Sequence, residues 1–181
     1  GAGEAWLGCA LVQCACRRGR SAVSARVPRM GGARRIRDGN GTFGETGDGG
    51  PATNATIDSV ISIAVDRARH ALYLCEGNNN RVRKVNLTNG LISNYAGTGL
   101  AGFGFSGDGG PATSAWFAFP DAVCTDGAGR LSISDLFNDR VRQVNPVTGI
   151  ITTIAGNGLG GVSSGDGGPA TSASLSPRRL T

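Results

Sequence analysis

The sequence contains few aromatic residues, one histidine and no long apolar run. Aromatic residues make up 6% of the 181 residues, and His70 is the single histidine. A membrane-spanning helix needs about 18 or more apolar residues in a row, so no membrane span is expected. Ser–His–Asp and Cys–His arrangements would all depend on one imidazole, and the several histidines of a zinc lyase are absent. The sequence therefore predicts no catalytic residue and no metal site.

Cysteine is also uninformative, although there are five of them. Cys9, Cys14 and Cys16 lie near the start of the chain, while Cys75 and Cys124 lie in segments expected to be strands. No pair has the C-x-x-C spacing of a zinc or redox site. We expect the last two to be small buried thiols and the first three to be incidental.

Positive charge is confined to one end of the chain. Residues 1–40 hold eight arginines against two acids, a balance of +6, whereas residues 41–181 hold ten Lys and Arg against eleven Asp and Glu, a balance of −1. A nucleic-acid-binding body should itself be basic. No nucleic-acid partner is expected for residues 41–181.

Residues 1–38 are interpreted as a basic tail of low order. Within them, the stretch from Arg17 to Arg37 is rich in Arg, Ala and Ser and poor in acids, which is typical of a transit peptide. A disordered leader or a stretch outside the native coding sequence is the plainer alternative. The sequons at Asn40, Asn54 and Asn86 are compatible with secretion. The compartment stays open, with a secreted or organellar location slightly favoured.

What the sequence does contain is glycine, in an internal repeat. There are 31 glycines, and the heptad GDGGPAT starts at Gly47, Gly107 and Gly165. NRVRKVN (80–86) returns as DRVRQVN (139–145), and ISNYAG (92–97) returns as ITTIAG (151–156). All these markers recur after 58 to 60 residues, which indicates a tandem structural repeat.

Each repeat predicts four short antiparallel strands. Turn residues about every ten positions separate runs rich in β-branched residues. Strands are expected at 59–66, 71–76, 81–87 and 91–97, and again at 121–126, 130–135, 139–145 and 149–156. A repeated four-stranded unit is typical of a propeller blade. The expected order is loop 39–58, blade 59–97, loop 98–120, blade 121–156 and the start of a third repeat at 157–181.

The combination of LYLCEGNNNRVRKV, the following ISNYAG and GDGGPATSA resembles the NHL repeat. The resemblance implies an all-β fold of antiparallel four-stranded blades in a six-bladed, TolB-like β-propeller. Glu76 replaces the usual Asp, which Asp135 keeps, and Val60 replaces the Pro that Pro120 keeps. Two blades cannot close a propeller, so we expect a fragment, with a trimer of two-blade chains as the alternative. RMGGARRIRD (29–38) stands where a preceding strand should be.

The pattern G-x-G-x-x-G occurs at 39–44, 97–102 and 156–161. A dinucleotide site needs this motif to open a helix in a βαβ unit. Here glycine and proline follow instead, and the pattern returns once per repeat. No G-x-x-x-x-G-K-[ST] phosphate loop is present. No cofactor is therefore expected.

Asp48, Asp108 and Asp166 recur within the heptad. They could line a cation site, but calcium needs several oxygen ligands that the glycines cannot supply. We expect these carboxylates to accept hydrogen bonds from turn amides, with glycines at positive φ. The Pro-Ala-Thr that follows is expected to begin one helical turn, with proline at its first position.

Four arginines recur on the third strand of each repeat: Arg81, Arg83, Arg140 and Arg142. They could face an acidic partner, but pairing with Glu76, Asp135 or Asp139 is the simpler hypothesis. His70 is expected in an exposed turn where the second repeat has Arg130. Recurrence itself favours a scaffold role, because a functional site usually breaks the symmetry of a repeat.

The function expected from these observations is non-enzymatic binding or scaffolding. A protein or small ligand would bind one face of the propeller, through residues that the sequence does not identify. Two alternatives stay open. The chain could be part of a metal-dependent, lactonase-like hydrolase or lyase whose active residues lie in absent blades, or part of the sensor ectodomain of a larger receptor or kinase.

Overall fold

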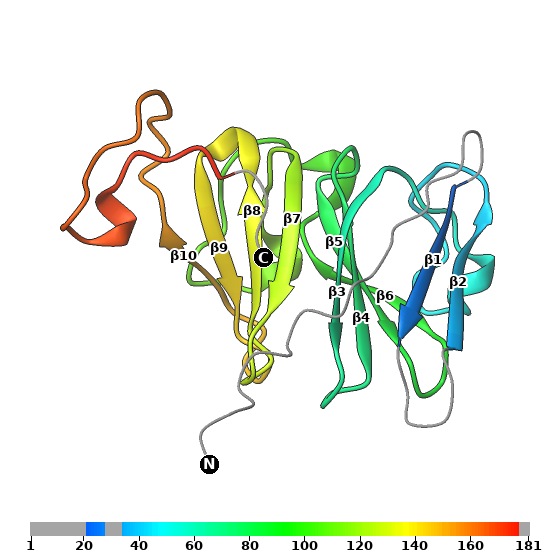
Figure 1. The fold of residues 1–181 in the computed structure, drawn as a ribbon. Coiled ribbons are helices and arrows are strands. Elements are labelled where there is room, and N and C mark those ends of the chain that lie inside the picture. The colour runs from blue at the N-terminus through cyan, green and yellow to red at the C-terminus, as the bar shows by residue number, and fades with distance from the viewer. Residues whose placement is uncertain (1–20, 28–33, 178–181) are drawn as a thin grey trace, which may run out of the picture.

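The computed structural model describes residues 21–27 and 34–177, and its regular structure is almost entirely β (Figure 1). Two antiparallel sheets of four strands stand side by side, and a two-stranded sheet lies beyond the first of them. Within the described residues the helices are 3₁₀ turns of three residues each. None of these described helices is long and apolar enough to cross a membrane. The predicted all-β class is confirmed.

The first sheet consists of β3 (Val60–Asp66), β4 (Ala71–Glu76), β5 (Arg81–Asn86) and β6 (Ile92–Ala96) in sequence order. Short turns rich in Gly and Asn join the strands, so each strand pairs with its neighbour in the chain. The observed bounds lie within one residue of the predicted ones. The meander of four strands is therefore confirmed.

The second sheet repeats this arrangement. It consists of β7 (Pro120–Thr125), β8 (Leu131–Asp135), β9 (Arg140–Val144) and β10 (Ile151–Ala155), again in sequence order. These bounds agree with the predicted strands to within two residues. Two consecutive repeats thus fold into two sheets of the same topology.

The main hydrophobic core lies between the two sheets. It gathers side chains from both sheets, among them Tyr73, Cys75 and Ile133, together with Phe117 from the segment that joins them. A second core covers the other face of the first sheet and includes Ile57, Leu72 and Leu74. Burial of these side chains stabilises each sheet, since a lone sheet would leave both faces in water.

The contact between neighbouring repeats has a recurring geometry. The Cys75 thiol donates to the Pro120 carbonyl at 3.2 Å. The equivalent residue of the second sheet, Ser134, donates its hydroxyl to the Pro177 carbonyl. The second sheet therefore meets residue 177 as the first sheet meets the second. This recurrence indicates stacking with a fixed step.

Three glycine-rich loops frame the sheets, and we call them loop 1 (residues 42–59), loop 2 (97–119) and loop 3 (156–177). In loop 1 the Gly49 amide donates to the Ile92 carbonyl of β6 at 2.8 Å. In loop 2 the Gly109 amide donates to the Ile151 carbonyl of β10, also at 2.8 Å. Each heptad therefore binds the outer strand of the sheet that follows it in the chain.

The heptad ends in one 3₁₀ turn, at Ala52–Asn54, Ala112–Ser114 and Ala170–Ser172. The predicted helical turn is confirmed, but the position of its proline is corrected. Pro51 and Pro111 precede the turn, with ψ of 130° and 129°, and are not its first helical residue. With these extended ψ values the backbone continues straight through each proline, and the 3₁₀ turn begins only at the alanine that follows.

The N-terminal part contains a strand pair, β1 (Ser21–Val27) with β2 (Arg34–Gly41). These two strands fall largely within residues 1–38, where low order was expected; residues 1–20 and 28–33 lie outside the described residues. The strand thought to be replaced by residues 29–38 is present as β2.

The β1–β2 pair occupies the place of a third and fourth strand of an earlier repeat. Val27 pairs with Arg34, and 58 residues later Val85 pairs with Ile92. Near the end of β2 the Asn40 amide donates to the Ala55 carbonyl at 2.9 Å, as the Asn157 amide just after β10 donates to the Ala173 carbonyl at 2.9 Å. The backbone follows the repeat here although the sequence does not show it.

Candidate functional site

One buried arginine joins loop 1 to the first sheet. The Arg83 side chain leaves β5 and is fully buried. Its Nε donates to the Asp48 carboxylate at 2.9 Å, and its two terminal nitrogens donate to the carbonyls of Thr56 at 2.8 Å and Thr46 at 3.2 Å. The planar guanidinium fork suits these separate oxygens. We call this arrangement clasp 1.

The same arrangement recurs in the second repeat as clasp 2. Nε and one terminal nitrogen of Arg142 donate to Asp108 at 3.0 and 2.6 Å. The terminal nitrogens also donate to the carbonyls of Trp116 and Ser106, each at 2.8 Å. The rings of Phe105 and Phe117 lie 4.9 and 5.0 Å from the guanidinium carbon, which adds cation–π attraction.

These contacts correct the role expected for the heptad aspartates. Asp48 and Asp108 accept from arginines of the third strand, not from amides of their own turn. The second oxygen of Asp108 accepts from the Thr153 amide of β10 at 2.9 Å. The repeat did contain a signal for this pairing. The heptad Asp returns after 60 residues and the third-strand Arg after 59, so the two keep nearly the same separation in both repeats.

A second acid lies behind each clasp, and in the first repeat it is Glu76. Its Oε2 accepts from Arg81 Nε at 2.8 Å and Asn79 Nδ2 at 3.0 Å, and its Oε1 lies 3.7 Å from an Arg83 nitrogen. The predicted pairing of Glu76 with arginine is confirmed. Burial raises the pKa of Glu76, and Arg81 opposes that rise.

In the second repeat the shorter Asp135 takes this place. Its carboxylate accepts from the Ala118 amide at 2.9 Å and from Asn138 Nδ2 at 2.8 Å, and lies 3.7 Å from an Arg142 nitrogen. Burial raises the pKa of Asp135 to about 6, against the lowering effect of these hydrogen bonds and of Arg142. The predicted pairing of Asp135 with arginine is confirmed.

Arg140 and Asp139 differ from the expectation. Arg140 donates to the carbonyls of Asn138 and Asn157 at 2.9 and 2.8 Å and lies 3.9 Å over the Phe105 ring. Within residues 34–177 the Asp139 carboxylate forms no ion pair with an arginine. Its predicted pairing is wrong, because the shorter Asp135 leaves Arg140 free to turn toward loops 2 and 3.

In two of the G-x-G-x-x-G segments, the first glycine lets the backbone pass close to a neighbouring segment of the chain. Gly97 and Gly156 both have φ of 91°, and a Cβ on either would lie 2.4 or 2.2 Å from the carbonyl oxygen of Asn80 or Asp139. The segment at 39–44 runs from β2 into loop 1. No α-helix follows any of the three in the part of the chain described, so the βαβ context of a dinucleotide site is missing.

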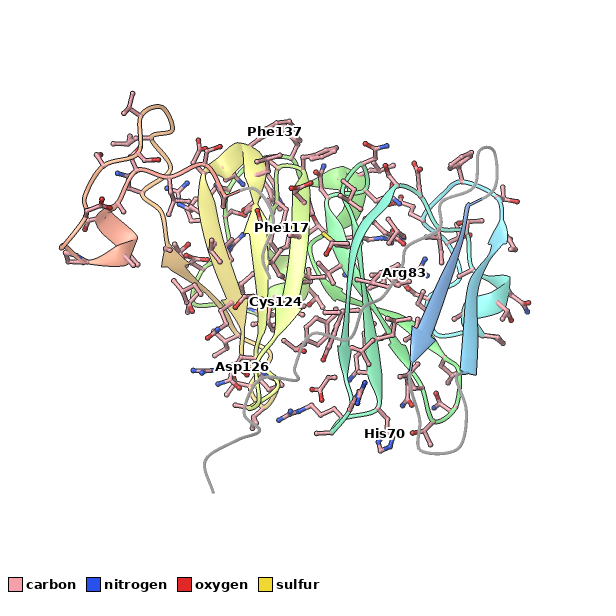
Figure 2. All side chains as sticks on the ribbon, viewed as in Figure 1. His70, Arg83, Phe117, Cys124, Asp126 and Phe137 are labelled. Carbon is pink, nitrogen blue, oxygen red and sulfur yellow. The ribbon has the colours of Figure 1, made fainter. Side chains whose placement is uncertain are left out.

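The reactive side chains are dispersed. His70 lies in the exposed turn between β3 and β4, far from the labelled Phe137 (Figure 2). Cys75 is buried between the sheets, which raises its pKa, and Cys124 is partly buried in β7. Across residues 21–27 and 34–177, no three His, Cys, Asp or Glu side chains gather closely enough to hold a metal ion.

Exposed apolar side chains gather at one end of the sheets. Phe43, Leu100, Phe103 and Phe137 are each 61–66% exposed, and we call them the apolar rim. Phe137 lies in the β8–β9 turn, and the other three residues lie in loops 1 and 2. A hydrogen bond from Asn79 Nδ2 to the Gly44 carbonyl, at 3.2 Å, holds loop 1 to the β4–β5 turn. A hydrogen bond from Asn138 Nδ2 to the Gly104 carbonyl, at 2.7 Å, holds loop 2 to the β8–β9 turn.

The opposite end of the sheets is charged. The turn between β3 and β4 holds an Asp66–Arg69 ion pair at 3.2 Å, and the turn between β7 and β8 holds Asp126–Arg130 at 2.6 Å. His70 and Asp126 mark this end in Figure 2. Val147, in the β9–β10 turn at this end, is an apolar residue that is 86% exposed. The two ends thus differ in chemistry.

Comparison with known proteins yields little. No protein-family model matches the chain. A curated protein of Pseudomonas fluorescens, described as the ATP-binding protein of insertion sequence IS1162, is 34% identical over 122 residues. The match covers 66% of this chain and 52% of that protein, so the chain spans about half the length of its relative. The phosphate-loop pattern is absent here, and the single lysine, Lys84, lies within β5.

Proposed function

We propose that this chain belongs to an NHL-type β-propeller and acts in non-enzymatic binding of a protein partner. The proposal of a propeller is supported by two sheets of equal topology, stacked with β3 against β7 and with a recurring contact to the next repeat. Four-stranded antiparallel sheets that repeat along the chain and pack against one another are typical of propeller blades. Closure of the ring needs further blades, from the same or from other chains.

The observation that carries the binding proposal is the apolar rim. Aromatic side chains are enriched at protein interfaces, and clustered exposed apolar residues mark interaction sites. The rim residues come from loops 1 and 2 and from the β8–β9 turn, which are held to the sheets by side-chain hydrogen bonds. A rigid rim loses little conformational entropy when a partner binds.

The buried acids favour scaffolding over catalysis. Glu76 and Asp135 are fully buried, and both already accept hydrogen bonds from neighbouring side chains. Their partners fasten the loops to the sheets. A hydrolase or lyase would require an additional reactive cluster in other blades.

The test uses peptides selected from a displayed library on the immobilised wild-type chain. The selected peptides are then measured against two variants by titration. Phe103→Ser with Phe137→Ser removes two rim side chains, and Val147→Ser removes an even more exposed apolar side chain at the other end. We expect the rim variant to weaken binding at least tenfold, a loss typical of interface aromatic residues, and the Val147 variant to bind as the wild type does.

Equal affinity for the rim variant and the wild type would refute the proposal, as would a selection that yields no binding peptide. Circular dichroism of each variant shows that its fold is retained. Stoichiometric metal in the purified chain, together with hydrolysis of a lactone, would favour the enzyme alternative instead.

A further inference from the structure

We infer that the apolar rim binds a basic segment of a protein partner, in which Lys or Arg side chains stand next to apolar ones. The basic side chains would meet three carboxylates at the rim end of the sheets. These belong to Glu45, Asp58 and Asp121, and we call them the rim acids. The inference rests on the proposed binding role of the apolar rim and adds the chemistry of the partner to it.

The rim acids do not recur, whereas the acids of the clasps and of the charged turns return in the next repeat. Each rim acid stands where the other repeat has an apolar residue. The counterparts, 60 residues away, are Phe105 for Glu45, Ala118 for Asp58 and Ile61 for Asp121. The backbone supports this alignment, because Ser59 and Phe119 both have positive φ, of 50° and 54°. A scaffold position keeps its residue type between repeats, so the rim acids indicate a role beyond the scaffold.

Glu45 lies beside a side chain of the apolar rim. Its Oε2 accepts from the Leu100 amide at 3.5 Å. In loop 2 the counterpart Phe105 lies under Arg140 instead, with 3.9 Å between its ring centroid and the guanidinium carbon. Glu45 is exposed and forms no ion pair with any side chain that the structure describes. A carboxylate without a described cation therefore lies next to Leu100.

The other two rim acids lie at the rim end of the first strand of each sheet. Asp58 comes just before Ser59, whose carbonyl accepts from the Gly77 amide of the β4–β5 turn at 3.2 Å. Asp121 lies where the register of the β7–β8 pairing shifts, and such bulges redirect a side chain. Strands β3 and β7 pack against each other. Neither carboxylate forms an ion pair with a described side chain.

The arginines at the rim end are not available to these acids. Those of the two clasps are fully buried, and Arg140 donates to two carbonyls. Among the side chains that the structure describes, the exposed Lys and Arg residues lie in turns at the opposite end, at Arg67, Arg69 and Arg130. The rim end therefore combines apolar surface with negative charge, while the opposite end has basic surface.

This combination selects among partners. Apolar side chains of a partner would cover Phe103 and Phe137, and an adjacent Arg would bind a rim carboxylate through two parallel hydrogen bonds. An acidic segment would place like charges together, which disfavours it. An anionic membrane surface attracts basic protein surfaces, so the rim acids also disfavour insertion of the exposed apolar side chains into such a membrane.

The test uses the peptides selected against the wild-type chain. They should contain more Lys and Arg than Asp and Glu, and replacing their Lys and Arg by Gln should weaken binding about tenfold. In the protein, Glu45→Gln with Asp121→Asn should weaken binding about fivefold at low salt, because opposite charges speed association, and high salt should reduce that difference. Asp126→Asn with Asp166→Asn removes two charges outside the rim and should leave binding unchanged.

The outcomes separate this inference from the proposed function. If Phe103→Ser with Phe137→Ser abolishes binding while the Glu45 and Asp121 variant and the Gln peptides bind as before, the rim binds a partner without regard to charge, and the inference is overturned. If neither variant changes binding, both proposals fail.

A lipid ligand is tested by sedimentation with vesicles of phosphatidylcholine and phosphatidylserine. We expect no binding that depends on Phe103 and Phe137. Sedimentation of the wild-type chain that is lost in the Phe103→Ser, Phe137→Ser variant would assign the rim to a membrane and overturn the inference. Circular dichroism verifies that each variant is folded.

Discussion

Loops 2 and 3 carry the same heptad and nearly the same backbone, yet only loop 2 closes around an arginine. Asp108 binds Arg142 from β9, and the loop packs against β10. Asp166 has no such partner in the described residues, and Ala170 beside it is exposed. The comparison teaches that the GDGGPAT heptad keeps its conformation without an arginine bound to its aspartate. Burial of the loop depends on a residue 34 positions further along the chain.

The heptad has the same backbone conformation with or without a bound arginine because glycine and proline within the heptad determine it. Gly107 and Gly165 have positive φ, which only glycine adopts at little cost. A Cβ added to Gly107 or Gly165 would lie only 2.8 or 2.9 Å from the Cα of Ala115 or Ala173. Pro111 and Pro169 fix φ near −60°. The heptad is therefore a rigid module that can exist before its partner arrives.

The largest effect should come from making loop 2 resemble loop 3. Arg142→Ala removes a fully buried guanidinium, which leaves Asp108 and two carbonyls without this donor and Asp135 without its nearby cation. Breaking a buried ion pair on one side typically costs about 3–5 kcal/mol. We expect the free energy of unfolding in urea to fall by about that amount, and the amides of residues 107–112 to exchange faster with solvent.

Arg130→Ala is the matched control for this change. Arg130 forms an exposed ion pair with Asp126, so its loss should change the unfolding free energy by no more than about 0.5 kcal/mol. Equal stability of the Arg142→Ala protein and the wild type would show that the clasp does not hold loop 2 to the sheet.

The next largest effect should be a pH dependence of the free energy of unfolding, caused by Asp135, the buried acid behind clasp 2. The pKa of Asp135 is raised from its ordinary value of 3.8 to about 6, so the folded protein binds this proton more tightly than the unfolded chain does. The free energy of unfolding should therefore fall as pH rises from about 4 to about 6. A shift of this size corresponds to about 2–3 kcal/mol.

Urea unfolding at a series of pH values measures this slope. Asp135→Asn should reduce it, and the additional change Glu76→Gln should flatten it further, because burial raises the pKa of Glu76 in the same direction. Stability that rises with pH over this interval in the wild type, or a slope unchanged in Asp135→Asn, would contradict the assignment.

The smallest effects compare the two aspartates directly. Asp108→Asn weakens the charged contact with Arg142 and should cost about 1–2 kcal/mol, as loss of a charge-assisted hydrogen bond does. Asp166→Asn removes no described contact and should change the unfolding free energy by less than about 0.5 kcal/mol. If the two variants lose equal stability, loop 3 has a partner within the chain.

Much of the fold follows from local patterns. The strands of both sheets were predicted to within two residues because turn residues bound each of them. The pairing of Glu76 with Arg81 was also predictable, since the two residues flank one hairpin. Pairing across 34 or 35 positions, as between Asp48 and Arg83, was not predicted. Strand β2 was missed because its sequence, RRIRDGNG, shares only its last glycines with the repeat.

The sequence by itself determined the strands, the turns and the shape of each heptad, because φ preferences and alternation of apolar residues act over a few positions. Only the tertiary structure decided that the heptad aspartates Asp48 and Asp108 meet Arg83 and Arg142. It also decided that Phe43, Leu100, Phe103 and Phe137 stay exposed at one end while Phe117 is buried between the sheets. The physical reason is that burial depends on the stacking of whole repeats, and that stacking places together residues far apart in the chain.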